Sequence, residues 1–291
     1  MKPAGKKPAG KSVHDAKLGE LRTGIDALDR KLVDLLSRRG ELVEEVGLRK
    51  RKLGMSFHHP AREREVLAKL VALNEGPYPD EAIEAIFREV MSASLALESP
   101  LTVAVVGDPA RAAALRRFGS AARLRDEAGA GDVVDAVARG WATYGVLVVE
   151  DSAHGFDGPA IDALGEGDVL VTGEVLFHSE GLATRALVVG GEEPAPTGDD
   201  QTSAVLVPRD EPGAIATMLA AFGKRGVNVR RIEGRPLRPS NATGRARWPY
   251  LFFVDLEGHR LAPPLSRALA DLARGSAHVR VLGSYPRGQA R

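Results

Sequence analysis

Apolar residues in the first part of the chain recur at alternating intervals of three and four positions, with charged residues between them. This spacing is typical of a helix that packs one face against other helices. It predicts one long helix over residues 18–53 with a buried apolar stripe. The members of this stripe are Leu18, Leu21, Ile25, Leu28, Leu32, Leu35, Leu42 and Val46.

The same helical spacing continues to residue 99, with breaks rich in glycine and proline at residues 54–60 and 74–79. Such breaks end helices. The pattern therefore predicts an all-α module of three helices over residues 18–100. From residue 101 onward, short β-branched runs alternate with helical stretches rich in alanine and arginine. This alternation of strand-like and helix-like segments predicts a single-lobe α/β module over residues 101–191.

A stretch rich in proline, glycine and acidic residues predicts a linker at residues 192–201. Beyond it, residues 202–288 show the order βαββαβ, which is that of an α+β ferredoxin-like domain. The sequence therefore predicts a multidomain protein. The expected strands of this last domain cover residues 203–207, 229–233, 250–256 and 279–282, and its helices cover residues 212–225 and 264–273.

The chain has 291 residues, of which 40 are basic and 39 acidic, and a formal net charge of +1. This balance gives no electrostatic basis for binding nucleic acid or an anionic membrane, so we expect neither partner. Cysteine is absent, which excludes disulfides and thiolate catalysis and agrees with a cytoplasmic location. Residues 1–17 carry lysines but no apolar stretch, so we expect a disordered, soluble tail rather than a secretory signal.

Three cations, Arg22, Arg39 and Lys50, stand on the long predicted helix. Arg39 falls on the apolar stripe, and Lys50 follows it by about three turns, so both point the same way about 16 Å apart. Cations on a stripe that should be buried indicate a bound anion. Arg22 points to a different side, so one helix cannot direct all three at one small ligand. Two antiparallel copies in a dimer could do so, with Arg22 supplied by the second chain.

The segments LRTGIDALDRKLVDLLSRRGELVEEVGLRK, HHPAREREVL and FREVMSASLALESP resemble the all-helical chorismate mutases along the whole module. The resemblance implies an intertwined homodimer of three-helix chains. His59 stands where that family commonly has an acidic residue next to the substrate, so its contribution is open. The residues that match the family's active site, in the family's order, are Arg22, Arg39, Lys50, Arg62, Glu63, Ser94 and Glu98.

The chemistry of this family explains these residue types. Chorismate is a dianion that rearranges to prephenate in a pericyclic step, which needs no nucleophile, metal or organic cofactor. It needs a charged enclosure that holds two carboxylates and stabilises the negative charge developing on the ether oxygen. The resemblance assigns the three arginines to the carboxylates, Glu63 to the ring hydroxyl and Ser94 to seating the substrate. Lys50 and Glu98 would act at the ether oxygen.

We hypothesise that Glu98 works in its protonated form, because a carboxylate would repel a developing oxyanion whereas a carboxylic acid can donate a hydrogen bond to it. The alternative for the whole module is an inactive helical dimerisation unit.

The segments VVDAVARGWATYGVLVVEDS, TGEVLFH and TRALVVG resemble parts of prephenate dehydratase domains. The resemblance has gaps: the family's glycine-rich opening is reduced, Asp151 replaces an asparagine and Ala186 replaces a phenylalanine. Residues 101–191 are also too few for the two lobes that enclose a dehydratase site. We therefore expect dehydratase activity to be lost, with Thr184 and Arg185 as vestiges at a strand edge. A fully bifunctional chorismate mutase/prephenate dehydratase is the alternative.

The segments DEPGAIATMLAAFGKRGVNVRRIEGRP, YLFFVDLEGH and VLGSYPR resemble the regulatory ACT domain of phenylalanine-controlled dehydratases. The resemblance implies an aromatic amino-acid effector, with phenylalanine expected. Gly234 replaces the family's serine, which removes a hydroxyl. A domain that serves only in dimerisation is the alternative here. The expected effector-binding residues are Glu211, Pro212, Gly213, Ala214, Ile215, Asn228, Glu233, Gly234, Arg235 and Pro236.

Taken together, these resemblances imply a chorismate mutase of aromatic amino-acid synthesis that forms a homodimer or a higher oligomer. A non-catalytic, amino-acid-sensing partner of another enzyme is the alternative from a different class.

Overall fold

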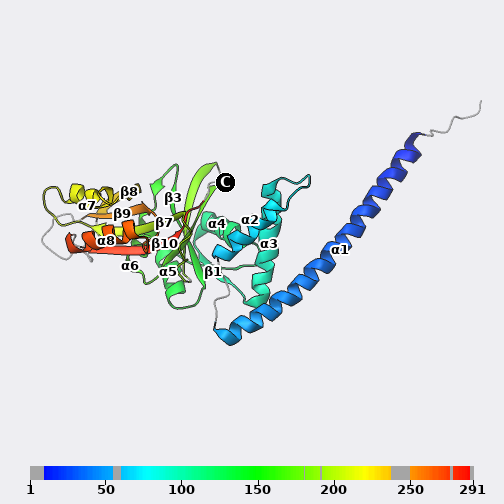
Figure 1. Cartoon of the computed structure of the whole chain (residues 1–291), viewed down its shortest axis with the longest axis horizontal. Helices are drawn as coiled ribbons and strands as arrows, with labels where there is room; N and C mark the ends of the chain where they lie inside the picture. Colours follow the sequence, from blue (N-terminus) through cyan, green and yellow to red (C-terminus); the bar gives the residue numbers. More distant parts are fainter. Residues whose placement is uncertain are drawn as a thin grey trace, which may run out of the picture. The chain divides into compact units, whose positions relative to one another are not determined.

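The computed structural model describes residues 10–54, 60–179, 181–190, 192–236, 250–275 and 278–288 (Figure 1). The described chain divides into two compact units. The first consists of the N-terminal helix together with residues 97–99, and the second contains the other described residues. His59 lies outside the described residues.

Helix α1 spans Gly10–Leu53 as one uninterrupted helix. It begins eight residues before the predicted start, so residues 10–17, predicted to be a disordered tail, extend the helix instead. A helix that is already nucleated gains one hydrogen bond per added residue, so it can continue through residues of modest helix propensity. The helix ends before Gly54, whose φ of 63° is the left-handed conformation that often follows a helix.

Helices α2 (Pro60–Ala72) and α3 (Asp80–Glu98) complete the predicted set of three. Asn74 fixes the turn between them, because its amide donates to the carbonyl of Tyr78 at 2.9 Å and to the Asp80 carboxylate at 2.7 Å. Since Asp80 begins α3, this bond joins the turn to the first residue of the helix.

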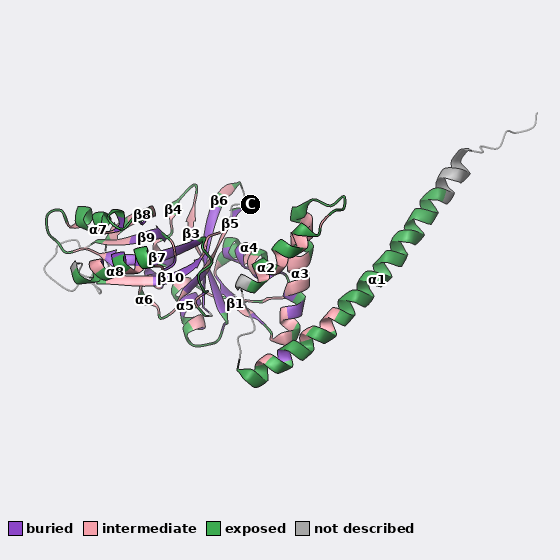
Figure 2. Ribbon diagram, viewed as in Figure 1, coloured by how far each residue is buried: buried purple, intermediate pink, exposed green. Residues whose placement is uncertain are grey.

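The middle of the chain forms one α/β layer, as the sequence predicts. Its sheet has the order β2-β1-β3-β6-β5, with β4 beside β3. β1 runs parallel to β2 and β3, whereas β6 is antiparallel to both of its neighbours. Of these strands, β3 and β6 are largely buried (Figure 2). The elements are β1 (Thr102–Val105), α4 (Gly107–Phe118), β2 (Arg123–Asp126), α5 (Ala130–Ala138), β3 (Tyr144–Asp151), β4 (Gly155–Phe156), α6 (Gly158–Glu166), β5 (Val171–Ser179) and β6 (Leu182–Val189).

The C-terminal domain has the predicted order βαββαβ and an antiparallel sheet in the order β10-β7-β9-β8. Helix α7 begins at Ala214, two residues after the predicted start, because Gly213 adopts a left-handed conformation with a φ of 80°. The elements are β7 (Asp200–Val207), α7 (Ala214–Gly223), β8 (Val229–Pro236), β9 (Tyr250–Glu257), α8 (Pro263–Gly275) and β10 (His278–Pro286).

The two faces of this second sheet are covered by different partners. One face packs against α7 and α8 around Met218, Phe222 and Leu265. The other face shares a single apolar cluster with the middle domain. Fully or nearly fully buried members of that cluster include Leu147, Ile161 and Leu187 from the middle domain and Phe253, Leu282 and Tyr285 from the C-terminal sheet.

The predicted linker at residues 192–201 is held in place. Its Pro194 carbonyl lies 3.0 Å from Nε2 of the buried His259, and its Glu193 carboxylate pairs with Arg260 at 2.5 Å. Its last two residues, Asp200 and Gln201, already belong to β7. Composition alone does not show these anchors, because they come from residues more than sixty positions further along the chain.

No described helix is long and apolar enough to span a membrane.

Candidate functional site

Lys50 of α1 and Glu98 of α3, the two residues expected at the ether oxygen, lie side by side. The Lys50 Nζ donates to the Glu98 Oε2 at 2.7 Å, and the two side chains are only 18% and 12% exposed. The guanidinium of Arg51 also donates to the main-chain carbonyl of Glu98, at 2.5 Å. The first compact unit therefore holds an ammonium and a carboxyl group together in a mostly buried place.

Gly47 makes this approach of α1 to the end of α3 possible. A Cβ atom at this position would lie 3.2 Å from both the Cα and the Cγ of Glu98. The sequence analysis did not single out Gly47. The available signal was a glycine inside a long helix, which costs about 0.5–1 kcal/mol relative to alanine and so needs a packing reason.

The other expected site residues of α1 are less buried. Arg22 is exposed and Arg39 is half-buried. The apolar stripe of α1, predicted to be buried, is exposed in the single chain, and each of its eight side chains is between 44% and 65% exposed (Figure 2). The periodicity indicates that this apolar face is buried in the native protein. It does not show whether the same chain or another chain packs against it.

The remaining expected site residues belong to the second unit. Arg62 forms an exposed ion pair with Glu65 at 2.8 Å. Glu63, expected at the ring hydroxyl, forms a mostly buried ion pair with Arg117 of α4, also at 2.8 Å. The hydroxyl of the buried Ser94 donates to the Val90 carbonyl at 2.6 Å, one helical turn earlier.

Arg185, expected to be a vestige at a strand edge, is instead buried in the interior strand β6. Its guanidinium donates to Glu174 at 2.9 Å and to the Tyr285 hydroxyl at 3.2 Å, and it pairs with Asp255 at 2.7 Å. The side chain is 5% exposed. Asp255 and Tyr285 belong to the C-terminal sheet, so this arginine joins two domains. Sequence reasoning could not find these partners, since they lie 70 and 100 residues away.

The burial of this network affects the acid–base properties of its members. Burial would lower the pKa of Arg185, but Tyr285, Asp255 and Glu174 together raise it above its usual value. Burial also raises the pKa of Tyr285, and the nearby Asp255 raises it further. Arg185 therefore stays charged and Tyr285 stays neutral.

Thr184, the other expected vestige, is also buried, and its hydroxyl donates to the Leu182 carbonyl at 3.3 Å. Asp151, which replaces the family's asparagine, accepts main-chain hydrogen bonds from Ala153 and His154, both at 2.8 Å. The hydrogen bond from the His154 amide is the main cause of a lowered pKa of Asp151. Both residues are thus engaged in local backbone contacts.

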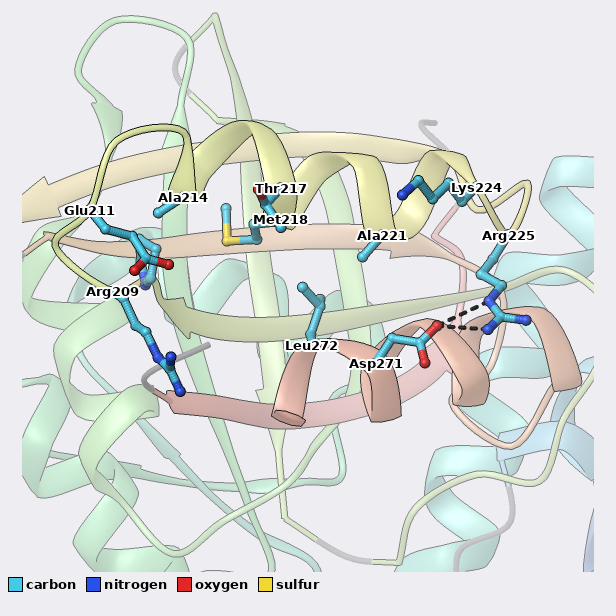
Figure 3. Close-up of a pocket in the computed structure, with 11 residues that line it drawn as sticks. Arg209, Glu211, Ala214, Thr217, Met218, Ala221, Lys224, Arg225, Asp271 and Leu272 are labelled. Carbon is cyan, nitrogen blue, oxygen red and sulfur yellow. Dashed lines mark hydrogen bonds and ion pairs between the residues drawn. The ribbon is translucent and has the colours of Figure 1, made fainter. Parts of the chain in front are cut away.

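A pocket of about 440 Å³ lies between α7 and α8 of the C-terminal domain (Figure 3). Arg209 and Glu211 stand at one end, and the ion pair between Arg225 and Asp271, at 2.7 Å, closes the other. Apolar side chains, including Met218, lie between these charged ends. Of the ten expected effector residues, Glu211 and Ala214 line this pocket.

The other expected effector residues lie on the turn before α7, in the first turn of α7, directly before β8 or along β8. Asn228 donates to Glu257 at 3.3 Å, and Arg235 pairs with Asp162 of α6 at 3.1 Å. Gly234 faces the ring of Phe252, because a Cβ atom at this position would lie 2.8 Å from the ring. The large Phe252 ring therefore explains why glycine stands here. Pro212 and Gly213 lie on the turn, the 46% exposed Ile215 lies in the first turn of α7, and Glu233 and Pro236 lie on β8.

Comparison with known proteins identifies two families along the chain. The family model of type II chorismate mutase matches residues 21–99, and that of the ACT domain matches residues 204–274. A bifunctional chorismate mutase/prephenate dehydratase of Pseudomonas aeruginosa is 30% identical over 362 residues, which cover 93% of this chain and 98% of the relative.

Two solved structures match about two thirds of this chain. Prephenate dehydratase from Streptococcus mutans is 26% identical with a TM-score of 0.55, and the match covers 65% of this chain and 100% of that chain. Prephenate dehydratase from Arthrobacter aurescens, solved in complex with L-Phe, is 22% identical with a TM-score of 0.53, and the match covers 64% and 90%. The second likeness concerns the fold alone.

The alignment with the Pseudomonas aeruginosa relative extends over 362 residues, although this chain has only 291. The relative therefore contains a stretch that has no counterpart here.

Proposed function

Since this chain belongs to the family of bifunctional chorismate mutase/prephenate dehydratases and is a chorismate mutase, we propose that conversion of chorismate to prephenate is the one reaction it retains. The observation that carries this proposal is the contrast between the two candidate sites. Lys50 and Glu98 form a polar pair on the mutase module, whereas Arg185 of the dehydratase-like module is buried and paired with Glu174 and Asp255.

In the proposed mechanism the side chains hold chorismate in the compact conformation from which it rearranges. Arginine forks bind carboxylates in two-point contacts, so Arg22, Arg39 and Arg62 would fix the two carboxylates of the substrate. Glu63 would bind the ring hydroxyl and Ser94 would help to seat the ring. For Glu63 to do so, the carboxylate must turn from Arg117, its partner in the free chain.

Lys50 and Glu98 would stabilise the transition state. The ether oxygen gains negative charge as the C–O bond breaks, and a donor already aimed at that position lowers the barrier without reorganisation. In the free chain the Lys50 ammonium donates to Glu98. A bound ether oxygen would accept from the same ammonium, and a protonated Glu98 would supply a second donor.

A second copy of the chain would complete the site. The stripe of α1 exposes eight large apolar side chains, more than soluble monomers leave in one contiguous patch. An antiparallel copy would cover the stripe and bring Arg22 of the partner subunit to the substrate. We therefore propose a homodimer or a higher assembly built on that dimer.

The loss of dehydratase activity is proposed from two observations. The relative carries a long stretch that this chain lacks, and dehydration with decarboxylation needs a closed pocket around a dianion. In addition, the side chain of Arg185 in the dehydratase-like motif is only 5% exposed, and its guanidinium contacts Glu174, Tyr285 and Asp255.

The C-terminal domain would sense an aromatic amino acid, with phenylalanine as the expected effector. The ACT family match and the L-Phe complex of the related fold support this role. Gly213 is the N-cap of α7 and makes no side-chain hydrogen bond to the start of this helix, whose main-chain amides favour a carboxylate. The effector set named from the sequence, from Glu211 to Pro236, remains the proposed site.

The test is an assay of chorismate and prephenate consumption by the purified full chain, with and without phenylalanine. We expect chorismate turnover, no prephenate turnover, and a change in chorismate turnover when phenylalanine is added. Phenylpyruvate formed from prephenate would instead establish the bifunctional enzyme.

The matched pair Arg39→Ala and Arg38→Ala locates the site. Loss of a charge-assisted hydrogen bond costs up to about 3 kcal/mol, so we expect Arg39→Ala to lower kcat/KM by about 100-fold. Arg38, the exposed neighbour, should be replaceable with little effect. Equal activity of the two variants would show that the site has been misplaced.

A further inference from the structure

Arg117, on α4 of the dehydratase-like module, contacts a residue that is assigned to the mutase site. Its guanidinium donates to the carboxylate of Glu63 at 2.8 Å, and the two side chains are 21% and 20% exposed. Glu63 lies in the first turn of α2, 54 positions before Arg117 in the sequence. Within the second compact unit, this mostly buried ion pair therefore joins the mutase module to its neighbour.

Helix α3 holds the end of α4 in place. Arg88 of α3 donates to the main-chain carbonyl of Arg116 at 2.9 Å. On the other side of Arg117, the left-handed Gly119 packs so closely against Ser92 that a Cβ atom at this position would clash with it. These contacts fix the main chain on both sides of Arg117, so its guanidinium is presented to α2 from a fixed place.

The ion pair and the substrate need the same carboxylate. In the proposed mutase mechanism Glu63 accepts a hydrogen bond from the ring hydroxyl of chorismate, whereas in the free chain it accepts one from Arg117. The guanidinium carries a charge and the hydroxyl does not, so Coulomb attraction favours the ion pair. Chorismate must therefore compete with Arg117 for Glu63.

The surroundings of the ion pair limit the cost of separating it. Both side chains line a pocket of about 500 Å³, whose wall carries five arginines and four acidic residues. Besides Glu63, these acidic residues are Glu84, Glu174 and Asp199. Arg117 thus keeps carboxylates in its surroundings when Glu63 turns to the substrate. A partly exposed pair of this kind is a weaker hold than a fully buried one, so the contact can open and close.

We propose that Arg117 holds the Glu63 carboxylate away from chorismate and thereby sets the affinity of the mutase for its substrate. The inference rests on the proposed function, which assigns Glu63 to the ring hydroxyl. Arg117 does not touch the substrate in this scheme but acts through Glu63. A module that has no reaction of its own then controls the reaction of the module beside it.

The experiment compares the chorismate turnover of Arg117→Gln and of the control Arg116→Gln, both made in the full chain. Each variant removes one guanidinium from the same end of α4 and from the same pocket. Arg116 is exposed, and its guanidinium lies 5.4 Å from the centre of the Phe177 ring. The control therefore removes the same charge but leaves the ion pair with Glu63 in place.

We expect Arg117→Gln to lower KM by about ten-fold and to leave kcat unchanged, because the competing ion pair is lost and the bound complex stays the same. A ten-fold change corresponds to about 1.4 kcal/mol. Arg116→Gln should keep the KM of the unsubstituted chain. Partial unfolding of a variant cannot imitate this result, since it lowers kcat and leaves KM unchanged.

An unchanged or higher KM in Arg117→Gln would overturn the proposal. It would show that Glu63 serves both donors at once or that it needs Arg117 as a support. An equal fall of KM in Arg116→Gln would also overturn it, because the lost charge alone would then explain the effect.

A second pair of variants tests whether Arg117 acts through Glu63. The amide of Glu63→Gln still accepts a hydrogen bond from a hydroxyl, but it carries no charge that attracts the guanidinium. Adding Arg117→Gln to this background should leave KM unchanged. A ten-fold fall of KM in this background as well would show that Arg117 acts on the substrate directly.

Failure of this proposal is distinguishable from failure of the proposed function. Absence of chorismate turnover by the unsubstituted chain counts against the mutase itself. Turnover with the same KM in the unsubstituted chain and in Arg117→Gln counts against the competition for Glu63 alone.

Discussion

At the scale of single residues, Arg185 shows how a buried charge can connect two domains. Removing a guanidinium from water is costly unless hydrogen bonds and opposite charges replace the solvent. Here Glu174 comes from the same domain, whereas Asp255 and Tyr285 come from the C-terminal sheet. The arginine is satisfied only when both domains are in place, so its contacts make the folding of one depend on the other.

Replacing Arg185 should therefore destabilise the second unit strongly. Breaking a buried ion pair by removing one member costs about 3–5 kcal/mol, so we expect Arg185→Met to lower the free energy of unfolding by about that amount. Denaturant unfolding followed by circular dichroism measures the change. The control Arg139→Met removes an exposed pair, which contributes about 1 kcal/mol or less. A loss at Arg185 no larger than that of the control would show that the network contributes little.

Tyr285 should make stability sensitive to alkaline pH. Its pKa in the folded chain is raised by burial, so the unfolded chain releases this proton first, from about pH 10 upward. The free energy of unfolding should consequently fall as pH rises above about 10. Tyr285→Phe should be less stable at neutral pH, because it loses hydrogen bonds to Ser203 and Arg185, but its stability should fall less with pH.

Denaturant unfolding of both proteins between pH 8 and 11 checks this difference in slope. Tyr144, whose pKa burial raises to about 12, contributes equally to both proteins and so cancels in the comparison. Parallel pH profiles would contradict the prediction.

At the scale of elements, the approach of α1 to the end of α3 depends on Gly47. Matched alanine substitutions in α1 separate helix propensity from this contact. At Gly24 nothing lies within 4 Å of the added Cβ atom, so Gly24→Ala should stabilise the helix by about 0.5–1 kcal/mol. At Gly47 the added atom would press on Glu98 at 3.2 Å.

Gly47→Ala should therefore lower the mutase kcat/KM by about ten-fold or more, since small displacements of positioned groups have large effects on rate. Chorismate turnover of the two variants provides the measurement. Similar kcat/KM values in both would show that the position of Glu98 is not important for the reaction.

Much of the element order could be predicted from the sequence, because it depends on local signals. Helical spacing and the breaks at Gly54 and Asn74 locate the three helices, and alternating short runs locate the strands of both sheets. Contacts between distant segments could not be predicted in this way. The pairing of Arg185 with Asp255, the fit of Gly47 to Glu98 and the anchoring of Pro194 by His259 all depend on packing rather than on spacing.

At the scale of the whole molecule, the exposed stripe of α1 predicts that the chain is not a monomer in solution. An apolar side chain in the middle of a helix–helix interface contributes about 2 kcal/mol, and a polar replacement adds the cost of burying an amide. Leu32→Asn should therefore weaken the assembly and lower mutase activity together, because the proposed site needs two chains. Light scattering coupled to size-exclusion chromatography, combined with chorismate turnover, measures both effects.

Arg30→Asn provides the control, because Arg30 lies on the opposite side of the same helix, about 160° from Leu32 at roughly 100° per residue. It should keep both the assembly and the activity. A monomeric unsubstituted chain with full turnover would exclude the shared site.

The apolar cluster shared by the two sheets has a consequence for the C-terminal domain when it is produced alone. Phe253 and Leu282 of that domain share this cluster with Ile161 and Leu187 of the middle domain. Without the middle domain, the inner face of the C-terminal sheet would be exposed to water, and exposed apolar patches of this kind promote aggregation.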